Sequence, residues 1–112
     1  MIIDKREENG VVVLEPAGRL DSNTAPVLEH EIDSVGAGND GHHLLVDFSN
    51  VEYISSAGLR VVLKVVKERQ TSPKSFAVSS MQDHVREVFE ISGFDAFITI
   101  YPDAMQAVVS FA

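Results

Sequence analysis

Apolar residues occur along this chain in two alternating patterns, short continuous runs and longer segments with helical spacing. Continuous runs rich in β-branched and aliphatic residues are typical of strands that are covered on both faces. Such runs occupy residues 11–14, 44–48, 76–78 and 97–100. Ile2 and Ile3 lie on the other side of the turn-forming sequence Glu8-Asn9-Gly10 from the first run, so we expect the chain to begin with a hairpin.

Four segments have apolar residues every three or four positions, as in amphipathic helices. The apolar sets are Ala25, Leu28, Ile32 and Val35; Leu59, Val62, Leu63 and Val66; Val85, Val88 and Phe89; and Met105, Val108 and Val109. Residues that favour helix N-termini precede each set: residues 21–24 before the first, Ser56 at the second, Ser80 at the third and Pro102-Asp103 at the fourth. The second helix has the clearest pattern and is expected over residues 56–69.

The predicted elements are a hairpin followed by helices and strands in alternation. Helices between successive strands supply the crossovers that parallel strands need. The sequence therefore predicts an α/β fold in a single domain over residues 1–112. Its sheet should be mixed but mostly parallel, with about five strands and about four helices.

Length and charge narrow the classes of function. A chain of 112 residues has the size of one domain, and its nine Lys and Arg against seventeen Asp and Glu give a net charge of −8. This acidic balance argues against a nucleic-acid partner, because nucleic acids are bound through their phosphates. The chain has no cysteine, signal peptide or membrane-spanning run, so we expect a cytoplasmic protein that does not insert into a membrane.

The chain lacks the common catalytic and cofactor-binding motifs, including the Gly-rich nucleotide loops, HExxH and GxSxG. Its four histidines do not place a pair of metal ligands beside a carboxylate on one helix face. The neighbouring His42 and His43 are interpreted as an exposed pair, and no base is evident for Ser55 or Ser56 as nucleophiles. We therefore predict no enzyme activity, no catalytic residue, no cofactor and no metal.

The most informative segment runs from Asp47 to Arg60, where a strand leads through a polar turn to two hydroxyls at the start of a helix. The first amides of a helix lack intrahelical partners and face outward with the positive end of the helix dipole. A phosphate is favoured at that end, so phosphorylation there would not melt the helix. The simpler interpretation is that Ser55 or Ser56 caps the helix, which contributes about 1 kcal/mol.

A phosphoserine would change the surface rather than the fold, because it adds about −1.5 to −2 charges at neutral pH. Against one carboxylate of a partner roughly 6 Å away, at an effective dielectric constant near 20, each added charge costs about 3 kcal/mol. That energy corresponds to about a hundredfold loss of affinity. A phosphate at this position would therefore act as a binding switch.

Three phrases of the chain resemble the STAS domain family, and within it the bacterial anti-sigma factor antagonists. They are the sequence from Val51 to Arg60, Gly18-Arg19-Leu20-Asp21, and Ile91-Ser92-Gly93-Phe94. The resemblance implies that a serine at the start of the second helix is phosphorylated by an anti-sigma factor that is also a serine kinase. It implies further that the unmodified domain binds this kinase and frees the sigma factor. A metal-dependent serine phosphatase would restore the unmodified state.

Carried onto this chain, the family's Asp-Ser-Ser-Gly phrase falls on Ser55-Ser56-Ala57-Gly58, which makes Ser56 the expected phosphoacceptor. The family's frequent Asp is Ser55 here, which leaves Ser55 as a second, competing hydroxyl, and the family's second Ser is Ala57. The expected partner-binding surface comprises Asp21, Ser22, Asn23, Thr24, Ser55, Ala57, Gly58, Arg60, Val61, Lys64 and Val65.

Several residues of this surface have a second interpretation. Val61 and Val65 are expected to form its apolar centre, on a flank of the helix that the sheet leaves uncovered. Arg60 and Lys64 are expected to pair with acidic groups, although Lys64 also fits an ordinary solvated flank. Asp21 also fits a helix-capping turn, and Gly58 also fits tight packing of the helix on the strand behind it.

Two other functions stay open at this point. An accessory STAS subunit of a membrane assembly, such as a phospholipid-transport ATPase, would contact a nucleotide-binding subunit constitutively. A sensor of a small ligand or nucleotide is supported only by analogy with other proteins of the fold.

Overall fold

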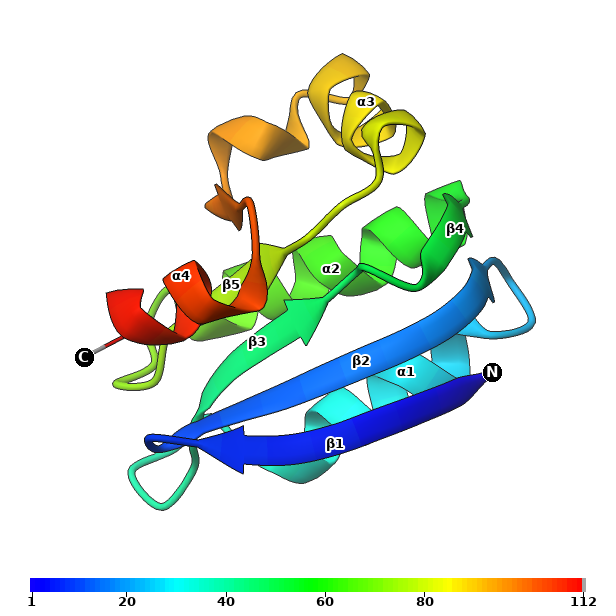
Figure 1. Ribbon diagram of the computed structural model, residues 1–112. Helices are drawn as coiled ribbons and strands as arrows, with labels where there is room; N and C mark the ends of the chain where they lie inside the picture. The colour runs from blue at the N-terminus through cyan, green and yellow to red at the C-terminus, as the bar shows by residue number, and fades with distance from the viewer. Residues whose placement is uncertain (112) are drawn as a thin grey trace.

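The computed structural model describes residues 1–111 and shows a mixed sheet with helices on both faces (Figure 1). The elements, in chain order, are β1 (Ile2–Glu8), β2 (Val11–Leu20), α1 (Ala25–Val35), β3 (His43–Asp47), β4 (Val51–Ile54), α2 (Ser56–Arg69), β5 (Phe76–Ser79), α3 (Asp83–Ile91), the short 3-10 helix η1 (Phe94–Ala96), β6 (Ile100–Tyr101) and α4 (Ala104–Ser110).

The sheet has the strand order β1-β2-β3-β5-β6, and β4 pairs with β2 beside this path. Only β1 and β2 are antiparallel, as the hairpin predicts, and the other pairs are parallel. β2 is long enough to pair twice: its residues 11–14 lie against β3 and its residues 18–20 against β4. The register shifts between Gly18 and Arg19, where Gly18 has a φ of +105°. Gly is suited to such a bulge because this backbone conformation is strained for other residues.

Alternate residues of the central strands face opposite sides of the sheet, which explains the continuous apolar runs. Val12, Leu14, Leu44, Val46 and Val78 join the larger core cluster with α1, α2 and α3. The opposite face of the sheet packs on α4 in a smaller cluster of Val11, Val13, Leu45, Ala77, Ala107 and Val108. α1 and α2 therefore lie on one side of the sheet and α4 on the other (Figure 1).

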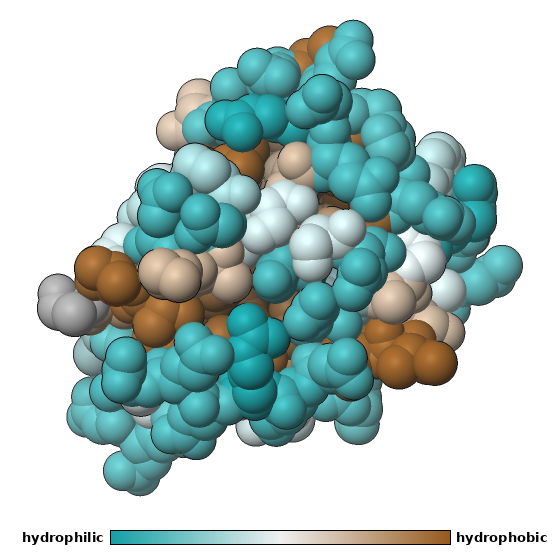
Figure 2. Space-filling model, in the orientation of Figure 1, coloured by the Kyte–Doolittle hydropathy of each residue, from teal (hydrophilic) through white to brown (hydrophobic). Residues whose placement is uncertain are grey.

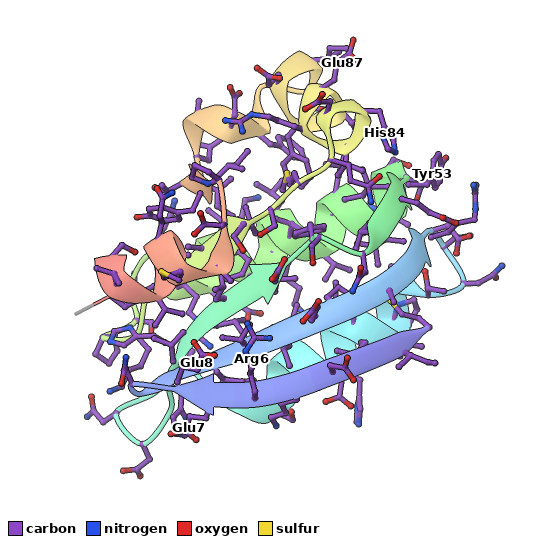
Figure 3. The ribbon with its side chains drawn as sticks, in the orientation of Figure 1. Arg6, Glu7, Glu8, Tyr53, His84 and Glu87 are labelled. Atoms are coloured by element: carbon purple, nitrogen blue, oxygen red, sulfur yellow. The ribbon has the colours of Figure 1, made fainter. Side chains whose placement is uncertain are left out.

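β1 forms an edge of the sheet and is protected by charge. Most of its side chains are exposed; Arg6 and Glu8 lie on the face of the sheet that carries α4, and Glu7 lies on the other side of the strand (Figure 3). Arg6 pairs with Glu8 at 2.9 Å and with Glu15 of β2 at 3.1 Å. Charged edge strands resist pairing with other chains. On the face that carries α4, apolar surface gathers on α4 and at the N-terminal end of β1, with Ile2, Met105 and Val109 exposed (Figure 2).

The hairpin, the first three predicted strands and the four helices are confirmed, and the fourth predicted strand, over residues 97–100, is present but displaced, because β6 begins only at Ile100. Gly93, with a φ of +76°, leads from α3 into η1, and Phe97 ends that turn with 63% of its surface exposed. β6 is only two residues long. The expected start of α3 at Ser80 is wrong, because Ser80 has a φ of +63° and the N-cap position falls on Gln82.

The sheet has six strands because β4 adds one that the apolar pattern did not reveal. Its two central residues, Glu52 and Tyr53, are exposed and only its ends are buried, so it has neither a continuous run nor an alternating pattern. Of the helices within residues 1–111, none combines the length and the apolar character needed to cross a membrane.

Candidate functional site

The ends of β2 and β4 bring two segments together that are far apart in the sequence. The strands are parallel, and Leu20 is paired with Ile54 at their last residues. The backbone amide of Ser55 donates to the carbonyl oxygen of Leu20 across 2.9 Å. The turn at residues 21–24 and the start of α2 therefore leave the same edge of the sheet as neighbours.

Ser55 and Ser56 occupy different environments although they are adjacent in the sequence. Ser56 is the first residue of α2 and its side chain is exposed. Ser55 precedes the helix in extended conformation, with φ −98° and ψ 176°, and its Oγ is buried without a hydrogen-bond partner among the described residues. An enzyme arriving from solvent can therefore reach the Ser56 hydroxyl, whereas the Ser55 hydroxyl is shielded.

The interpretation of these serines as helix caps is wrong. Ser55 holds the N-cap position, but its side chain accepts no hydrogen bond from the helix amides. The first turn of α2 contains no acidic residue either. The positive end of the helix dipole is thus not offset by an acidic or capping side chain of this first turn, so an anion attached to Ser56 would be favoured there.

Asp21 organises the neighbouring turn through hydrogen bonds. Its Oδ1 accepts from the amide of Asn23 at 3.0 Å and from the amide of Thr24 at 3.2 Å. The bond from Asn23 is the largest of several effects that lower the pKa of the Asp21 carboxyl. The Thr24 hydroxyl donates to the carbonyl oxygen of Arg19 at 2.7 Å, while Ser22 is exposed. Asp21 therefore holds the turn, but no side chain of the described residues caps α1, whose N-cap is Thr24. The pairing of Leu20 with Ser55 places this turn next to the start of α2.

Gly58 fits the packing interpretation, because the surrounding side chains leave no room for a larger residue. A Cβ at this position would lie 2.8 Å from Cγ1 of Ile54 and 2.9 Å from Cγ of Leu20. The start of α2 is thus pressed against the ends of β4 and β2. This contact fixes where the helix begins and, with it, where Ser56 is presented. Ala57, beside it, is partly buried against the same core.

The prediction that Val61 and Val65 form the apolar centre of an exposed surface is wrong. Only 8% of Val61 and 2% of Val65 is exposed, and both belong to the larger core cluster. α1 lies beside α2 and covers this flank of the helix, through core residues such as Leu28. The sheet is therefore not the only layer that buries α2.

The two cations expected to face a partner, Arg60 and Lys64, differ in whether they form ion pairs within the chain. Lys64 Nζ lies 2.8 Å from Glu29 Oε2 and 3.8 Å from Glu68 Oε1. Its hydrogen bond with Glu29 is the main reason that the pKa of Lys64 is raised. Lys64 is thus paired within the chain on an exposed flank of α2. Arg60 is exposed and has no ion-pair partner among residues 1–111.

The structure adds residues to this edge that the sequence analysis missed. The guanidinium carbon of Arg19 lies 4.0 Å from the ring centroid of Tyr53, in a cation–π contact between paired residues of β2 and β4. Tyr53 of β4 has His84 of α3 beside it (Figure 3), and the His84 Nε2 donates to the carbonyl oxygen of Glu52. Recognition of β4 as a strand parallel to β2 would have paired Arg19 with Tyr53.

Comparison with known proteins agrees with this architecture. BtrV of Bordetella bronchiseptica, named as a candidate anti-sigma factor antagonist, is 36% identical over 86% of this chain and 79% of its own. The crystal structure of an anti-sigma factor antagonist from Mycobacterium paratuberculosis superposes with a TM-score of 0.88 at 25% identity, covering 98% of this chain and 92% of the other.

A third similarity concerns the fold alone. The phosphorylated form of the Bacillus cell-fate determinant SpoIIAA has a TM-score of 0.74 at 16% identity, over 99% of this chain and all of the other (100%). The model of the STAS domain family matches residues 3–107. These include every element from β2 to α3, and with them the turn at residues 21–24 and the start of α2. On this match and on the similarity to BtrV, the chain belongs to the STAS domain family.

Proposed function

We propose that this protein is an anti-sigma factor antagonist that switches partners through phosphorylation of Ser56. In the unmodified state it binds an anti-sigma factor with serine kinase activity, and the sigma factor is released. The observation that carries the proposal is the contrast between the exposed side chain of Ser56 and the buried Oγ of Ser55 at the start of α2. A phosphoacceptor must first be accessible to the kinase from solvent. Of the two hydroxyls, only that of Ser56 is.

The transfer moves the γ-phosphoryl group of ATP to Ser56 Oγ, with release of ADP and of the hydroxyl proton. The product has a dianionic group at the first residue of a helix, where the dipole and free amides stabilise it. The core beneath is untouched, because the Ser56 side chain points to solvent. The unmodified and phosphorylated chains should therefore share one fold and differ in the charge that they present.

Charge explains why the modified form loses its partner. The chain already has a net charge of −8, and the Asp21 carboxylate lies in the turn next to α2. A partner that docks over this edge meets a site whose one nearby α2 cation is Arg60, a single helical turn from Ser56. The added negative charge outweighs the charge of Arg60 and repels any carboxylate of the partner that Arg60 would otherwise attract.

Exposure of Ser56 also serves the reverse reaction. A metal-dependent serine phosphatase must reach the phosphate from solvent. Ser56, as the exposed first residue of α2, is accessible to it. The comparisons support the antagonist function through the names of BtrV and of the Mycobacterium paratuberculosis protein. The existence of a phosphorylated SpoIIAA with this fold supports the mode of regulation.

The experiment that tests the proposal maps the phosphate after incubation with the cognate anti-sigma factor kinase and ATP. Mass spectrometry should find one phosphate on Ser56 in the wild-type chain and in Ser55→Ala, and none in Ser56→Ala. The Ser55→Ala variant is the matched control, since it removes the adjacent hydroxyl. Phosphate on Ser55, or modification of Ser56→Ala to the same extent as wild type, would overturn the assignment.

A further inference from the structure

A groove runs between the C-terminal half of α2 and the segment around η1, away from Ser56. One hollow of about 290 Å³ is lined by Leu63, Val66, Lys67, Gln70, Phe94 and Phe97. A second hollow of about 230 Å³ adjoins it and shares Val66, Gln70 and Phe97. The wall formed by Phe97 is unusual, because 63% of this aromatic residue is exposed.

The position of Phe97 follows from the local backbone and not from a need of the core. Gly93 turns the chain out of α3, and the amide of Phe97 closes η1 by donating to the carbonyl oxygen of Phe94 at 3.0 Å. The next residue, Ile98, is buried and anchors the segment. Phe97 thereby lines one hollow with Leu63 and Val66 of α2 while most of its surface stays exposed. An exposed aromatic beside an apolar hollow is typical of a binding surface.

The charge along α2 is opposite to that of the whole chain. Four of the nine Lys and Arg residues of the protein fall within α2, as Arg60, Lys64, Lys67 and Arg69, whereas Glu68 is its one acidic residue. Two of these cations are engaged: Lys64 pairs with Glu29, and the Arg69 guanidinium donates to the carbonyl oxygens of His42 and Gly36.

Arg60 and Lys67 are the two cations of α2 that stay available. Both are exposed and neither forms an ion pair among residues 1–111. They are seven residues apart, so they lie on one face of the helix, with Leu63 between them. A shallow hollow is lined by these three residues together with Lys64 and Glu68. It shares Leu63 and Lys67 with the groove, so the two exposed cations adjoin the groove.

We propose that this surface docks an acidic amphipathic segment of a partner protein. The α2 groove, defined by Leu63, Lys67, Phe94 and Phe97, receives an apolar side chain of that segment between Leu63 and the two aromatic rings. Carboxylates flanking that side chain meet Lys67 and Arg60. The complementary charge identifies the occupant as acidic. The contact does not involve the Ser56 hydroxyl. It shares Arg60 with the surface that phosphorylation controls and adds Lys67 and the apolar groove to it.

The test uses a synthetic peptide of about 14 residues with leucines on one helical face and glutamates elsewhere. The matched peptide has lysine in place of every glutamate. Each is titrated into the ¹⁵N-labelled full chain, and amide chemical shifts are followed by NMR. The acidic peptide should shift the amides of α2 from Leu63 to Gln70 and of η1, with little change at the α4 face. The lysine peptide should bind at least about tenfold more weakly.

Three variants of the chain make the test specific. Phe97→Ser and Lys67→Glu should each weaken binding of the acidic peptide by about tenfold or more. Ile91→Ser is the control, because Ile91 is 79% exposed but does not line the groove; it should bind as wild type does. Far-UV circular dichroism checks that each variant is folded. Absence of shifts in the groove, equal binding of the two peptides, or equal losses for Phe97→Ser and Ile91→Ser would overturn the proposal. None of these readouts depends on phosphorylation of Ser56.

Discussion

Ser55 and Leu20 are joined by a backbone hydrogen bond of 2.9 Å, from the amide of Ser55 to the carbonyl oxygen of Leu20. This bond continues the pairing of β4 with β2 by one step beyond Ile54. It holds Ser55 in extended conformation so that its side chain turns inward, and the helix begins at the next residue with its side chain outward. The bond thereby determines which of the two adjacent serines is exposed to solvent.

Replacement of Ser55 by Ala tests the burial of its hydroxyl. A buried polar atom without a partner carries a desolvation cost of about 1–3 kcal/mol. Ser55→Ala removes that cost, so the free energy of unfolding should stay unchanged or rise by up to about 3 kcal/mol. Urea denaturation measures this change, with Ser56→Ala as the exposed control. A loss above about 1 kcal/mol for Ser55→Ala would show that the hydroxyl has a partner that stabilises the fold.

Replacement of Gly58 by Ala tests the close contact between α2 and the strand ends. The added methyl group would overlap Ile54 and Leu20, and such overpacking costs about 1–3 kcal/mol. Alanine in place of glycine gains up to about 1 kcal/mol in helix propensity, which offsets part of that cost.

The expected net result for Gly58→Ala is a fall of about 1–2 kcal/mol in the free energy of unfolding. Gly38→Ala provides the comparison, because a Cβ there meets no atom within 4 Å and the change should stay within about 0.5 kcal/mol. If Gly58→Ala were at least as stable as wild type, the packing account of the helix start would be wrong.

A negative charge at Ser56 should leave the fold intact. In Ser56→Asp the carboxylate lies at the positive end of α2, which contributes about 0.3–1 kcal/mol, and Arg60 stands four residues further along the same face. The melting temperature should therefore equal or slightly exceed that of Ser56→Ala. A calorimetric scan at low ionic strength would show this, and added salt should reduce the difference. A clearly lower melting temperature would mean that the modification acts by unfolding.

The Asp21 carboxyl predicts a dependence of stability on pH. Its pKa is lowered in the folded chain, first by the hydrogen bond from the amide of Asn23. A lowered pKa means that the folded state binds the proton less readily than the unfolded state does. The stabilisation is therefore complete above the unfolded pKa of about 3.9 and is lost as the pH falls through the lower folded value.

The variant Asp21→Asn, whose side-chain oxygen can still accept from the turn, lacks this titration. Urea denaturation of both chains at several pH values between about 6 and 3 compares the slopes. The free energy of unfolding of the wild type should fall more steeply below about pH 4 than that of Asp21→Asn. Parallel curves would show that the carboxylate does not hold the turn.

The sequence predicts those elements whose local pattern agrees with their environment. α2 was expected over residues 56–69 and occupies them, because its apolar spacing and its last basic residues are both helical signals. α4 begins after Asp103, whose side chain accepts from the amide of Gln106 at 2.8 Å as an N-cap should.

The predictions that failed concern residues whose exposure or pairing is set by other elements of the fold, which a local sequence pattern does not reveal. Val61 and Val65 look like an exposed flank until α1 is placed beside α2. Phe97 looks like strand core, yet the turn after Gly93 holds it in solvent. β4 is buried only at its ends, so it becomes evident only through its pairing with β2. The same pairing gives Ser55 and Ser56 different exposure to solvent, which cannot be predicted from their identical side chains.

The most direct test of the proposed switch is the affinity of the chain for the anti-sigma factor kinase proposed as its partner, measured by isothermal titration calorimetry. Wild type and Ser56→Ala should bind alike, because the exposed hydroxyl is not needed for docking. Ser56→Asp should bind about a hundredfold more weakly, the loss expected when one negative charge opposes a carboxylate of the partner roughly 6 Å away. Equal affinities of Ser56→Ala and Ser56→Asp would contradict the account.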